Sequence, residues 1–145
     1  MPLATVQISP ILQPVVTLLL LNCIMLVWLY ILRLPAVQKQ GIVLDASLPR
    51  GEQMSSLPAK VRWKADNYNH LLEQPLLFYV ACLVLAVLGA GHGLNLMLAW
   101  TYVGLRALHS FHQALWNYIP IRFLLFAASS VVLIALVTSL ALAVF

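Results

Sequence analysis

Four ionisable or amide side chains lie in a mostly apolar stretch of the chain near residue 110. They are Arg106, His109, His112 and Gln113. At 3.6 residues per turn, Arg106, His109 and Gln113 fall along one face of a helix. Ionisable groups inside a membrane segment are unfavourable and usually mark functional sites, and an arginine can bind a carboxylate through paired hydrogen bonds. This face therefore predicts binding of an anionic ligand.

A second arginine, Arg122, follows Pro120 at the start of the last apolar stretch. Proline suits the first turn of a helix, where the amides have no partner within the helix. Those free amides and an adjacent arginine together attract an anion. Two arginines with no acid nearby in the sequence suit a ligand that bears a carboxylate. The alternative is that Arg122 and Lys64 extend to lipid phosphate groups at the membrane surface.

Glu73 is the only acid in the apolar portion of the chain. An isolated buried carboxylate is unfavourable by several kcal/mol, so it must be paired or protonated. We therefore expect Glu73 to be paired, with Arg106 as its partner. The face that carries Glu73 also holds Asp66 and His70, with Asn67 and Gln74 beside it.

A metal centre is a competing interpretation of these residues. Imidazole and carboxylate ligands are available from His70, Glu73, His109 and His112. However, the spacing His109-x-x-His112 is a weak signal by itself, and no H-E-x-x-H motif accompanies it. We therefore expect no metal.

The composition identifies the environment that must hold these residues. Of 145 residues, 63% are hydrophobic and 8% are charged, and the mean hydropathy is +0.96. Soluble domains are usually about 25% charged. These values exclude a soluble domain, a disordered chain and a nucleic-acid-binding module, since eight scattered Lys and Arg residues form no basic patch. The sequence predicts an integral membrane protein.

The charges divide the chain into membrane segments. Ten of the twelve lie between Arg33 and Glu73, and Arg50 is among them. A membrane-spanning helix needs about 20 apolar residues. The uncharged runs predict four transmembrane helices, with a tight glycine-rich turn between the second and third. The expected spans are 11–33, 70–89, 94–114 and 120–143, and the expected polar loop is 34–65.

The orientation follows from the loops. Lys39, Arg50, Lys60, Arg62 and Lys64 all fall in or next to one loop, and Arg122 flanks the short loop on the same side. Positively charged loops stay in the cytoplasm. Both termini are therefore expected on the non-cytoplasmic side. The first apolar segment is too long, and lacks the basic start, for a signal peptide.

Three motifs in this order resemble the MAPEG family, the membrane-associated proteins in eicosanoid and glutathione metabolism, and especially its bacterial branch. They are DNYNHLLEQPLLFY at 66–79, WTYVGLRALHS at 100–110 and Pro120-Ile121-Arg122. The resemblance implies one domain over residues 1–145, an all-α four-helix bundle assembled as a homotrimer, and a bacterial inner membrane location. It also implies glutathione bound between subunits, a lipophilic small molecule entering from the bilayer, and contact with membrane lipid.

The resemblance also assigns roles to individual residues. Arg122 matches the family arginine near the glutathione thiol and is the expected catalytic residue. The expected glutathione-binding residues are Arg33, Asn67, His70, Glu73, Arg106, His109 and Gln113. Of these, Arg33 matches the basic residue that ends the first span, and its alignment is the loosest.

Several family side chains are replaced in this sequence. His70 stands where the family has asparagine, and Gln113 where the synthases have tyrosine. Phe123 and Phe126 replace a serine and a tyrosine. The preferred hypothesis is a glutathione-dependent transferase or peroxidase-like enzyme acting on lipophilic electrophiles. The alternatives are a non-catalytic MAPEG-fold protein that binds a lipid or an anionic metabolite, and a small transporter built on Glu73 and the histidines.

Overall fold

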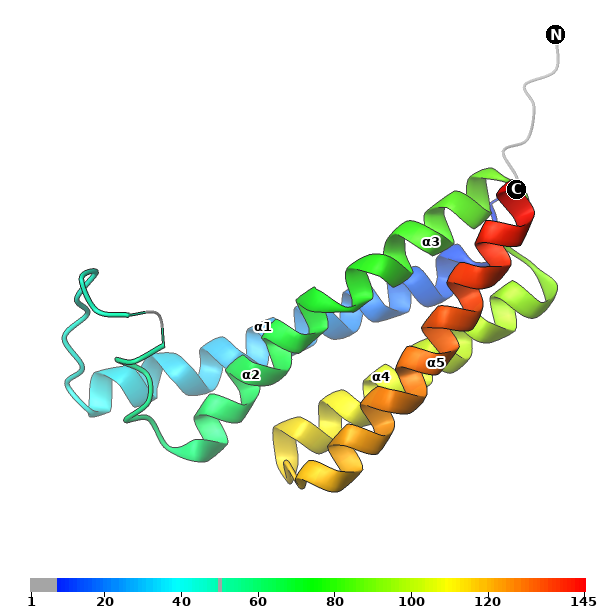
Figure 1. Cartoon of the computed structure of the whole chain (residues 1–145). Helices are drawn as coiled ribbons and strands as arrows, with labels where there is room; N and C mark the ends of the chain where they lie inside the picture. Colours follow the sequence, from blue (N-terminus) through cyan, green and yellow to red (C-terminus); the bar gives the residue numbers. More distant parts are fainter. Residues whose placement is uncertain (1–7, 50) are drawn as a thin grey trace, which may run out of the picture.

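The computed structural model describes residues 8–49 and 51–145, and Arg50 lies outside the described residues. Its helices are α1 (Leu12–Lys39), α2 (Ala59–Glu73), α3 (Pro75–Val87), α4 (Gly93–Leu115) and α5 (Ile119–Val144). They run up and down in one bundle, and α1 begins at the end of the bundle where α5 finishes (Figure 1). This all-helical architecture agrees with the expected class.

Helices α2 and α3 follow one another along nearly the same line (Figure 1). They are separated only at Gln74, because Pro75 has no amide hydrogen to continue the helical ladder. Gln74 itself keeps helical dihedral angles, φ −65° and ψ −39°. The break is therefore local, and the two helices act as one long rod.

Within the described residues, three helices are long and apolar enough to cross a membrane: Leu12–Lys39, the continuous Ala59–Val87 and Ile119–Val144. They support an integral membrane protein. Helix α4 coincides with the remaining expected span but is not among these three. Its hydropathy is lowered by Arg106, His109, Ser110 and Gln113, all of which are buried inside the bundle.

The non-helical segment after α1 is shorter than the expected loop 34–65, because α1 continues to Lys39 and α2 already begins at Ala59. Gly41 determines where α1 ends. It has φ +61°, its amide donates to Gln38 O, and the next amide, of Ile42, donates to Val37 O. This is a Schellman C-cap, which favours glycine.

Gly89 closes α3 in the same way. It has φ +69°, its amide donates to Ala86 O, and the amide of Ala90 donates to Leu85 O. The expected glycine-rich turn therefore lies between α3 and α4, with the first glycine serving as the cap.

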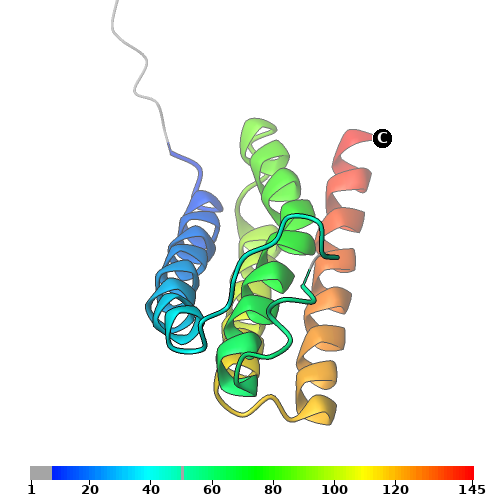
Figure 2. The same ribbon diagram turned by 90° about the vertical axis from the view of Figure 1, so that its left-hand side faces the viewer.

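The bundle is thin, and much of its apolar surface faces outward. Helices α1 and α5 stand on opposite sides of the α2–α3 rod and α4 (Figure 2). Helix α5 buries only Ser129, Leu133 and Leu136, while its other large apolar side chains are mostly exposed. In a membrane these side chains meet lipid or another chain, so the molecule needs only a narrow core.

Candidate functional site

Helices α2, α4 and α5 enclose a buried polar cluster around Arg106. The guanidinium is 0% exposed, and its Nη2 donates a hydrogen bond of 2.7 Å to the backbone carbonyl of His70. One turn away, Asn67 Nδ2 donates to Ser110 Oγ at 2.8 Å. These two bonds connect α2 to α4. Because both lie in apolar surroundings, water does not compete for these hydrogen bonds.

The side chain of Phe126, on α5, covers this cluster. Its ring centroid lies 5.7 Å from Arg106 Cζ and 6.0 Å from the His109 ring. The His70 ring lies 6.1 Å from that of His109, edge to face. A cation above an aromatic face is attracted by the ring quadrupole. Phe126 therefore closes the cluster while stabilising its charge.

Several polar atoms in the cluster have no hydrogen-bond partner among the residues that the structure describes. They are Arg106 Nε and Nη1, Asn67 Oδ1, His109 Nδ1, and Gln113 Nε2 and Oε1. A buried polar atom left unpaired costs about 1–3 kcal/mol, so nearly all such atoms in proteins are satisfied by protein, water or a ligand. The cluster consequently has unused capacity to bind a polar molecule.

The expected ion pair between Glu73 and Arg106 is wrong. The Glu73 side chain is 69% exposed, and its Oε2 lies 3.4 Å from His70 Nδ1. Glu73 is two residues beyond the buried Leu71, which places it about 200° around the helix. Its carboxylate therefore points away from α4, with His70 beside it.

Arg122 lies in the first turn of α5, as expected, and is held by the preceding turn. Its Nη1 donates a 2.7 Å hydrogen bond to Asn117 Oδ1. Asn117 has φ +52°, the left-handed conformation that asparagine tolerates better than most residues. This fixes Arg122 at the α4–α5 turn.

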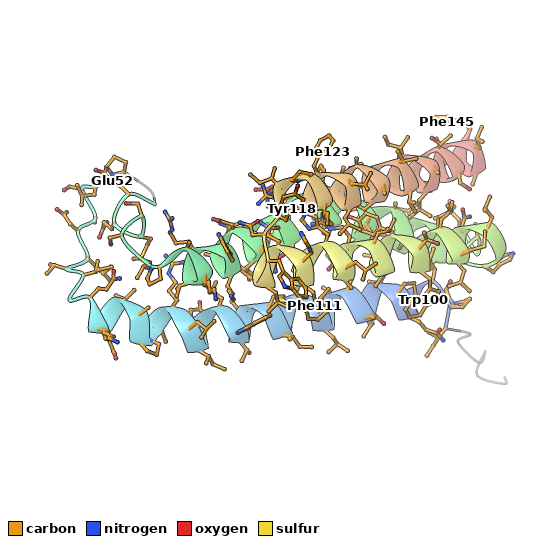
Figure 3. The ribbon with its side chains drawn as sticks, turned by 90° about the horizontal axis from the view of Figure 1, so that it is seen from below. Glu52, Trp100, Phe111, Tyr118, Phe123 and Phe145 are labelled. Carbon is orange, nitrogen blue, oxygen red and sulfur yellow. The ribbon has the colours of Figure 1, made fainter. Side chains whose placement is uncertain are left out.

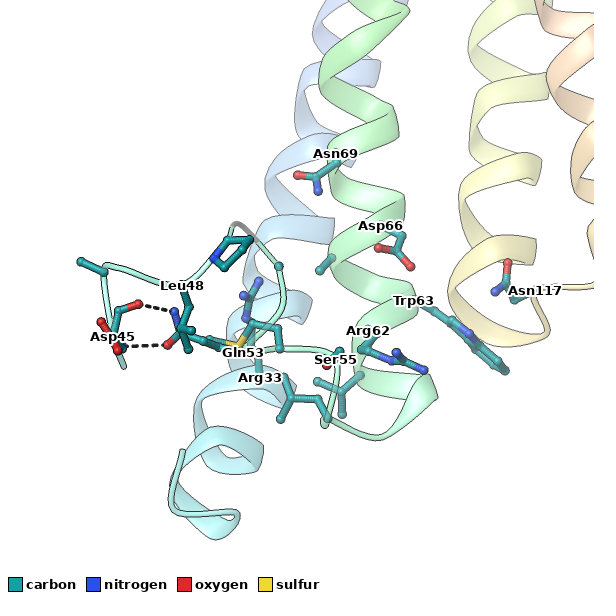
Figure 4. A pocket seen from close by; sticks show the side chains of 17 residues that line it. Arg33, Asp45, Leu48, Gln53, Ser55, Arg62, Trp63, Asp66, Asn69 and Asn117 are labelled. Atoms are coloured by element: carbon teal, nitrogen blue, oxygen red, sulfur yellow. Dashed lines mark hydrogen bonds between the residues drawn. The ribbon is translucent and has the colours of Figure 1, made fainter. Parts of the chain in front are cut away.

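Arg33 is not brought together with Arg106. It lines a cavity of about 730 Å³ between α1, the loop and α2 (Figure 4), and an adjoining cavity of about 550 Å³ along α1. None of the α4 residues Arg106, His109 and Gln113 lines either cavity. The structure thus separates Arg33 from Arg106, whereas Asn117, which holds Arg122, also lines the first cavity.

Lys64 packs inside the molecule. It is buried, and its Nζ lies 5.2 Å from the centre of the Trp28 ring. The alternative in which Lys64 extends to lipid phosphate is therefore not the arrangement that the structure has.

No three His, Cys, Asp or Glu side chains converge as metal ligands within residues 8–49 and 51–145.

The two aromatic replacements face in different directions. Phe123 is 68% exposed and projects away from the bundle (Figure 3), whereas Phe126 covers the Arg106 cluster. Of the two phenylalanines, Phe126 therefore belongs to the interior of this chain and Phe123 to its outer surface.

Sequence reasoning missed Ser110, Asn117 and the covering role of Phe126. Ser110 lies four residues after Arg106, so helical periodicity was a sufficient signal for it. Asn117 follows the end of a helix, a position where asparagine often adopts φ > 0. Nothing in the sequence reveals that Phe126 lies over Arg106, because this depends on how α5 packs against α4.

A second polar network crosses the middle of the bundle. Gln74 Nε2 donates to Ser130 Oγ at 2.7 Å, and Tyr102 Oη donates to Gln74 Oε1 at 3.4 Å. Asn22 Nδ2 donates to Tyr79 Oη at 3.0 Å. Such bonds hold helices together in lipid, where hydrophobic burial gives little driving force. We assign these residues to packing.

Comparison with known proteins agrees with this architecture. No curated protein and no solved structure matches the chain. The family model described as the MAPEG family matches residues 11–142, which include every described helix except the last residues of α5. The chain is a member of the MAPEG family.

Proposed function

We propose that this protein is a membrane-embedded, glutathione-dependent transferase or peroxidase-like enzyme that acts on lipophilic electrophiles. Membership of the MAPEG family supports a membrane function related to glutathione. The observation that carries the proposal is the unused hydrogen-bonding capacity of the Arg106 cluster. Arg106 keeps two nitrogens without a partner, Nε and Nη1, within the described residues.

Glutathione has the chemistry to satisfy that capacity. Its carboxylates accept charge-assisted hydrogen bonds, which are about twice as strong as neutral ones. Its amide groups match Gln113 and Asn67, whose unpaired atoms include both donors and acceptors. Because Arg106 is closed off by Phe126, binding requires this ring or its helix to move. His70 and Glu73, on the exposed side of α2, lie where glutathione would enter the Arg106 cluster.

Arg122 is the residue we assign to the thiol. A guanidinium near a thiol favours the thiolate and lowers its pKa. The thiolate sulfur then attacks the electrophilic carbon of the second substrate, a carbon–sulfur bond forms and the leaving group departs with its electron pair. Asn117 would hold Arg122 in place through the bond between Oδ1 and Nη1.

We further propose a homotrimer in a bacterial inner membrane, with both termini on the non-cytoplasmic side. The outward apolar face of α5 supports contacts with lipid and with neighbouring chains. Light scattering that subtracts the detergent gives the protein mass of the assembly. A mass of three chains agrees with the proposal, and a mass of one chain contradicts it.

The test is glutathione binding to the purified full chain in a neutral detergent, measured by calorimetry. Saturable binding is expected, and Arg106→Lys and Arg122→Ala are both expected to weaken it. Lys39→Ala is the matched control, since Lys39 is an exposed basic residue that lines neither cavity. Absence of binding at millimolar glutathione to the unmodified chain contradicts the proposed function.

A non-catalytic role is the second candidate, favoured by the position of Phe126. This residue occupies the place of a family tyrosine and seals Arg106 from the outside. Assays with chlorodinitrobenzene and cumene hydroperoxide separate the two candidates. Binding of glutathione without turnover of either substrate favours the non-catalytic protein, and turnover that Arg122→Ala abolishes favours the enzyme.

A further inference from the structure

His70 and Glu73 form an ion pair on the outward side of α2. His70 Nδ1 lies 3.4 Å from Glu73 Oε2, and the two side chains are 39% and 69% exposed. Within residues 8–49 and 51–145, no other basic side chain lies within ion-pair distance of an acidic one. This pair is therefore a distinctive feature of the described part of the chain.

The surface around the pair is apolar. Leu76 and Leu77, three and four residues after Glu73, are both 60% exposed, and this spacing places them on the same side of the α2–α3 rod as Glu73. An exposed ion pair between residues three apart adds little to stability. Stability alone therefore does not account for an acid among lipid-facing leucines.

The partner of Glu73 is a histidine, and this residue type allows proton transfer. Lysine and arginine keep their charge near neutral pH, whereas a histidine can gain and lose a proton there. A carboxylate beside Nδ1 favours the tautomer with its proton on Nδ1, and this leaves the lone pair of Nε2 free. The same combination of carboxylate and imidazole prepares the general base of serine hydrolases. The pair thus has the chemistry of a proton acceptor.

The other neighbours of His70 are side chains of the Arg106 cluster. The His70 ring centroid lies 6.1 Å from that of His109 and 6.2 Å from that of Phe126. The backbone carbonyl of His70 accepts the hydrogen bond from Arg106. The imidazole therefore lies between the outward carboxylate of Glu73 and the rings that close the buried cluster.

The face of α5 next to His70 also carries Arg122. Arg122 and Phe126 are four residues apart, so they are neighbours on one face of the helix. Arg122 is the residue assigned above to the glutathione thiol. A thiol bound at this face is flanked by a guanidinium on α5 and by the His70 imidazole on α2.

The charge around His70 comes from three helices. Residues 12–32 of α1 and all of α3 carry no charged side chain. The titratable and charged groups near the ring are Asp66 and Glu73 on α2, Arg106 and His109 on α4, and Arg122 on α5. Among the described side chains, only Glu73 is within ion-pair distance of His70.

We propose that His70 accepts the proton of the glutathione thiol, and that Glu73 is the positioning residue that orients its imidazole. The S–H bond breaks, the proton moves to Nε2 of the neutral imidazole, and the electron pair stays on sulfur as a thiolate beside Arg122. The thiolate displaces the leaving group of the electrophile, which departs with its electron pair. The imidazolium then gives its proton to water. Because it assigns a proton acceptor to the same site, this role rests on the proposed function.

The first test counts protons when glutathione binds. Calorimetry of the purified full chain at mildly alkaline pH, in two buffers of different ionisation enthalpy, gives the number of protons released per glutathione bound. Ultraviolet absorbance measures the thiolate in the same samples. For the unmodified chain we expect a thiolate without proton release, since the proton stays on His70. A thiolate formed with release of a full proton to the buffer overturns the proposal, and so does binding without a thiolate.

The second test separates catalysis from binding, with chlorodinitrobenzene as the electrophile. His70→Asn is expected to lower kcat about a hundredfold, the usual effect of losing a general base, while KM for glutathione stays nearly unchanged. Added imidazole is expected to restore part of the activity of His70→Ala. His92→Asn is the matched control, because His92 is an exposed histidine at the other end of α4. A purely structural role of His70 predicts no response to imidazole.

Glu73 is tested as a positioning residue. Glu73→Gln is expected to lower kcat about tenfold, as is typical when the partner that orients a functional histidine is lost, and Glu73→Asp is expected to recover part of the loss. Imidazole is not expected to rescue Glu73→Gln, since His70 still occupies its place. Glu52→Gln is the matched control, because it removes an exposed carboxylate from the loop. Equal effects of Glu73→Gln and Glu52→Gln overturn the role of Glu73.

Different results contradict the two proposals. Absence of glutathione binding to the unmodified chain contradicts the proposed function, and the role of His70 with it. Turnover that His70→Asn leaves unchanged overturns the role of His70 alone. If glutathione binds without turnover, or if His70→Asn does not fold, the proton count on the unmodified chain still decides whether His70 holds the thiol proton.

Discussion

Arg106 and Arg33 are both arginines near the same end of the bundle, yet their surroundings are opposite. Arg106 is fully buried under Phe126 and makes one side-chain hydrogen bond, to the His70 carbonyl. Arg33 borders two open cavities and has no partner among the described residues. Phe126 or its helix must move before Arg106 can bind a ligand. Arg33 can bind one without such a movement.

This difference has a physical origin in the helices that carry the two residues. Helix α4 turns its polar face inward, so Arg106 is covered by neighbours on α2 and α5. Arg33 lies near the end of α1, where the loop arches away and leaves space. A charge within a closed apolar bundle is expensive and is retained mainly for function, whereas a charge at a helix end is common.

The largest expected contrast is in chemical access. Treatment of the folded protein with hydroxyphenylglyoxal is expected to modify Arg33 while Arg106 remains intact, because a fully buried side chain reacts only through local opening. Peptide mapping by mass spectrometry measures both positions. Arg62 is the exposed reference, and protein unfolded in dodecyl sulfate shows that every arginine can react. Equal modification of Arg106 and Arg62 in the folded protein contradicts the closed cluster.

The next effect concerns ligand binding. Arg106→Met removes the guanidinium but keeps much of the volume, and loss of a buried partner of a charged group weakens binding by about 2–5 kcal/mol. Glutathione affinity is therefore expected to fall at least thirtyfold, roughly 2 kcal/mol. The free energy of unfolding is expected to change little, because the lost hydrogen bond to the His70 carbonyl is offset by the removal of two buried nitrogens that have no partner. Calorimetry and thermal unfolding measure the two quantities. If Arg106→Met loses its assembled state while the protein that remains folded binds glutathione with unchanged affinity, Arg106 is a structural residue.

The sequence predicted one of these two environments better than the other. Helical spacing was enough to place Arg106, His109 and Gln113 on one face, because α4 is a regular helix and these three residues are all buried. The partner of Arg106 was not predictable in the same way. The Glu73 carboxylate is on the correct helix, but it points outward, and the His70 backbone carbonyl takes its place.

The cavities at Arg33 were beyond sequence reasoning for a different reason. Their walls come mainly from α1, the loop and α2, with Asn117 of the α4–α5 turn at the first cavity. Their shape depends on the path of a non-helical segment. The sequence marks this segment as a loop, but Gly41 and the reciprocal bonds of Asp45 and Gln53 determine where it runs. Loop paths depend on such specific contacts, whereas helix faces depend on periodicity.

Two neighbouring asparagines allow a smaller test of the same contrast. Asn67 is buried and donates to Ser110, whereas Asn69 is exposed beside the cavities. Asn67→Leu is expected to lower the free energy of unfolding by about 1–3 kcal/mol, because it leaves Ser110 without its partner. Asn69→Leu is expected to change it by less than about 0.5 kcal/mol. Thermal unfolding in neutral detergent compares the two, and equal losses contradict the assignment of Asn67 to the interior.

The smallest expected effect comes from the two phenylalanines of α5. Phe126→Leu removes the ring over Arg106, an interaction of about 1 kcal/mol for a partly buried pair, while the side chain stays apolar. Phe123→Leu, three residues earlier on the exposed face, is expected to cost less than about 0.5 kcal/mol. Thermal unfolding compares the stability of the two variants. Mapping with hydroxyphenylglyoxal measures access to Arg106: Phe126→Leu is expected to expose Arg106 to the reagent, and Phe123→Leu is not. If Arg106 stays protected in Phe126→Leu, the cluster is closed by the packing of α2 against α4, and Phe126 is not the element that must move when glutathione enters.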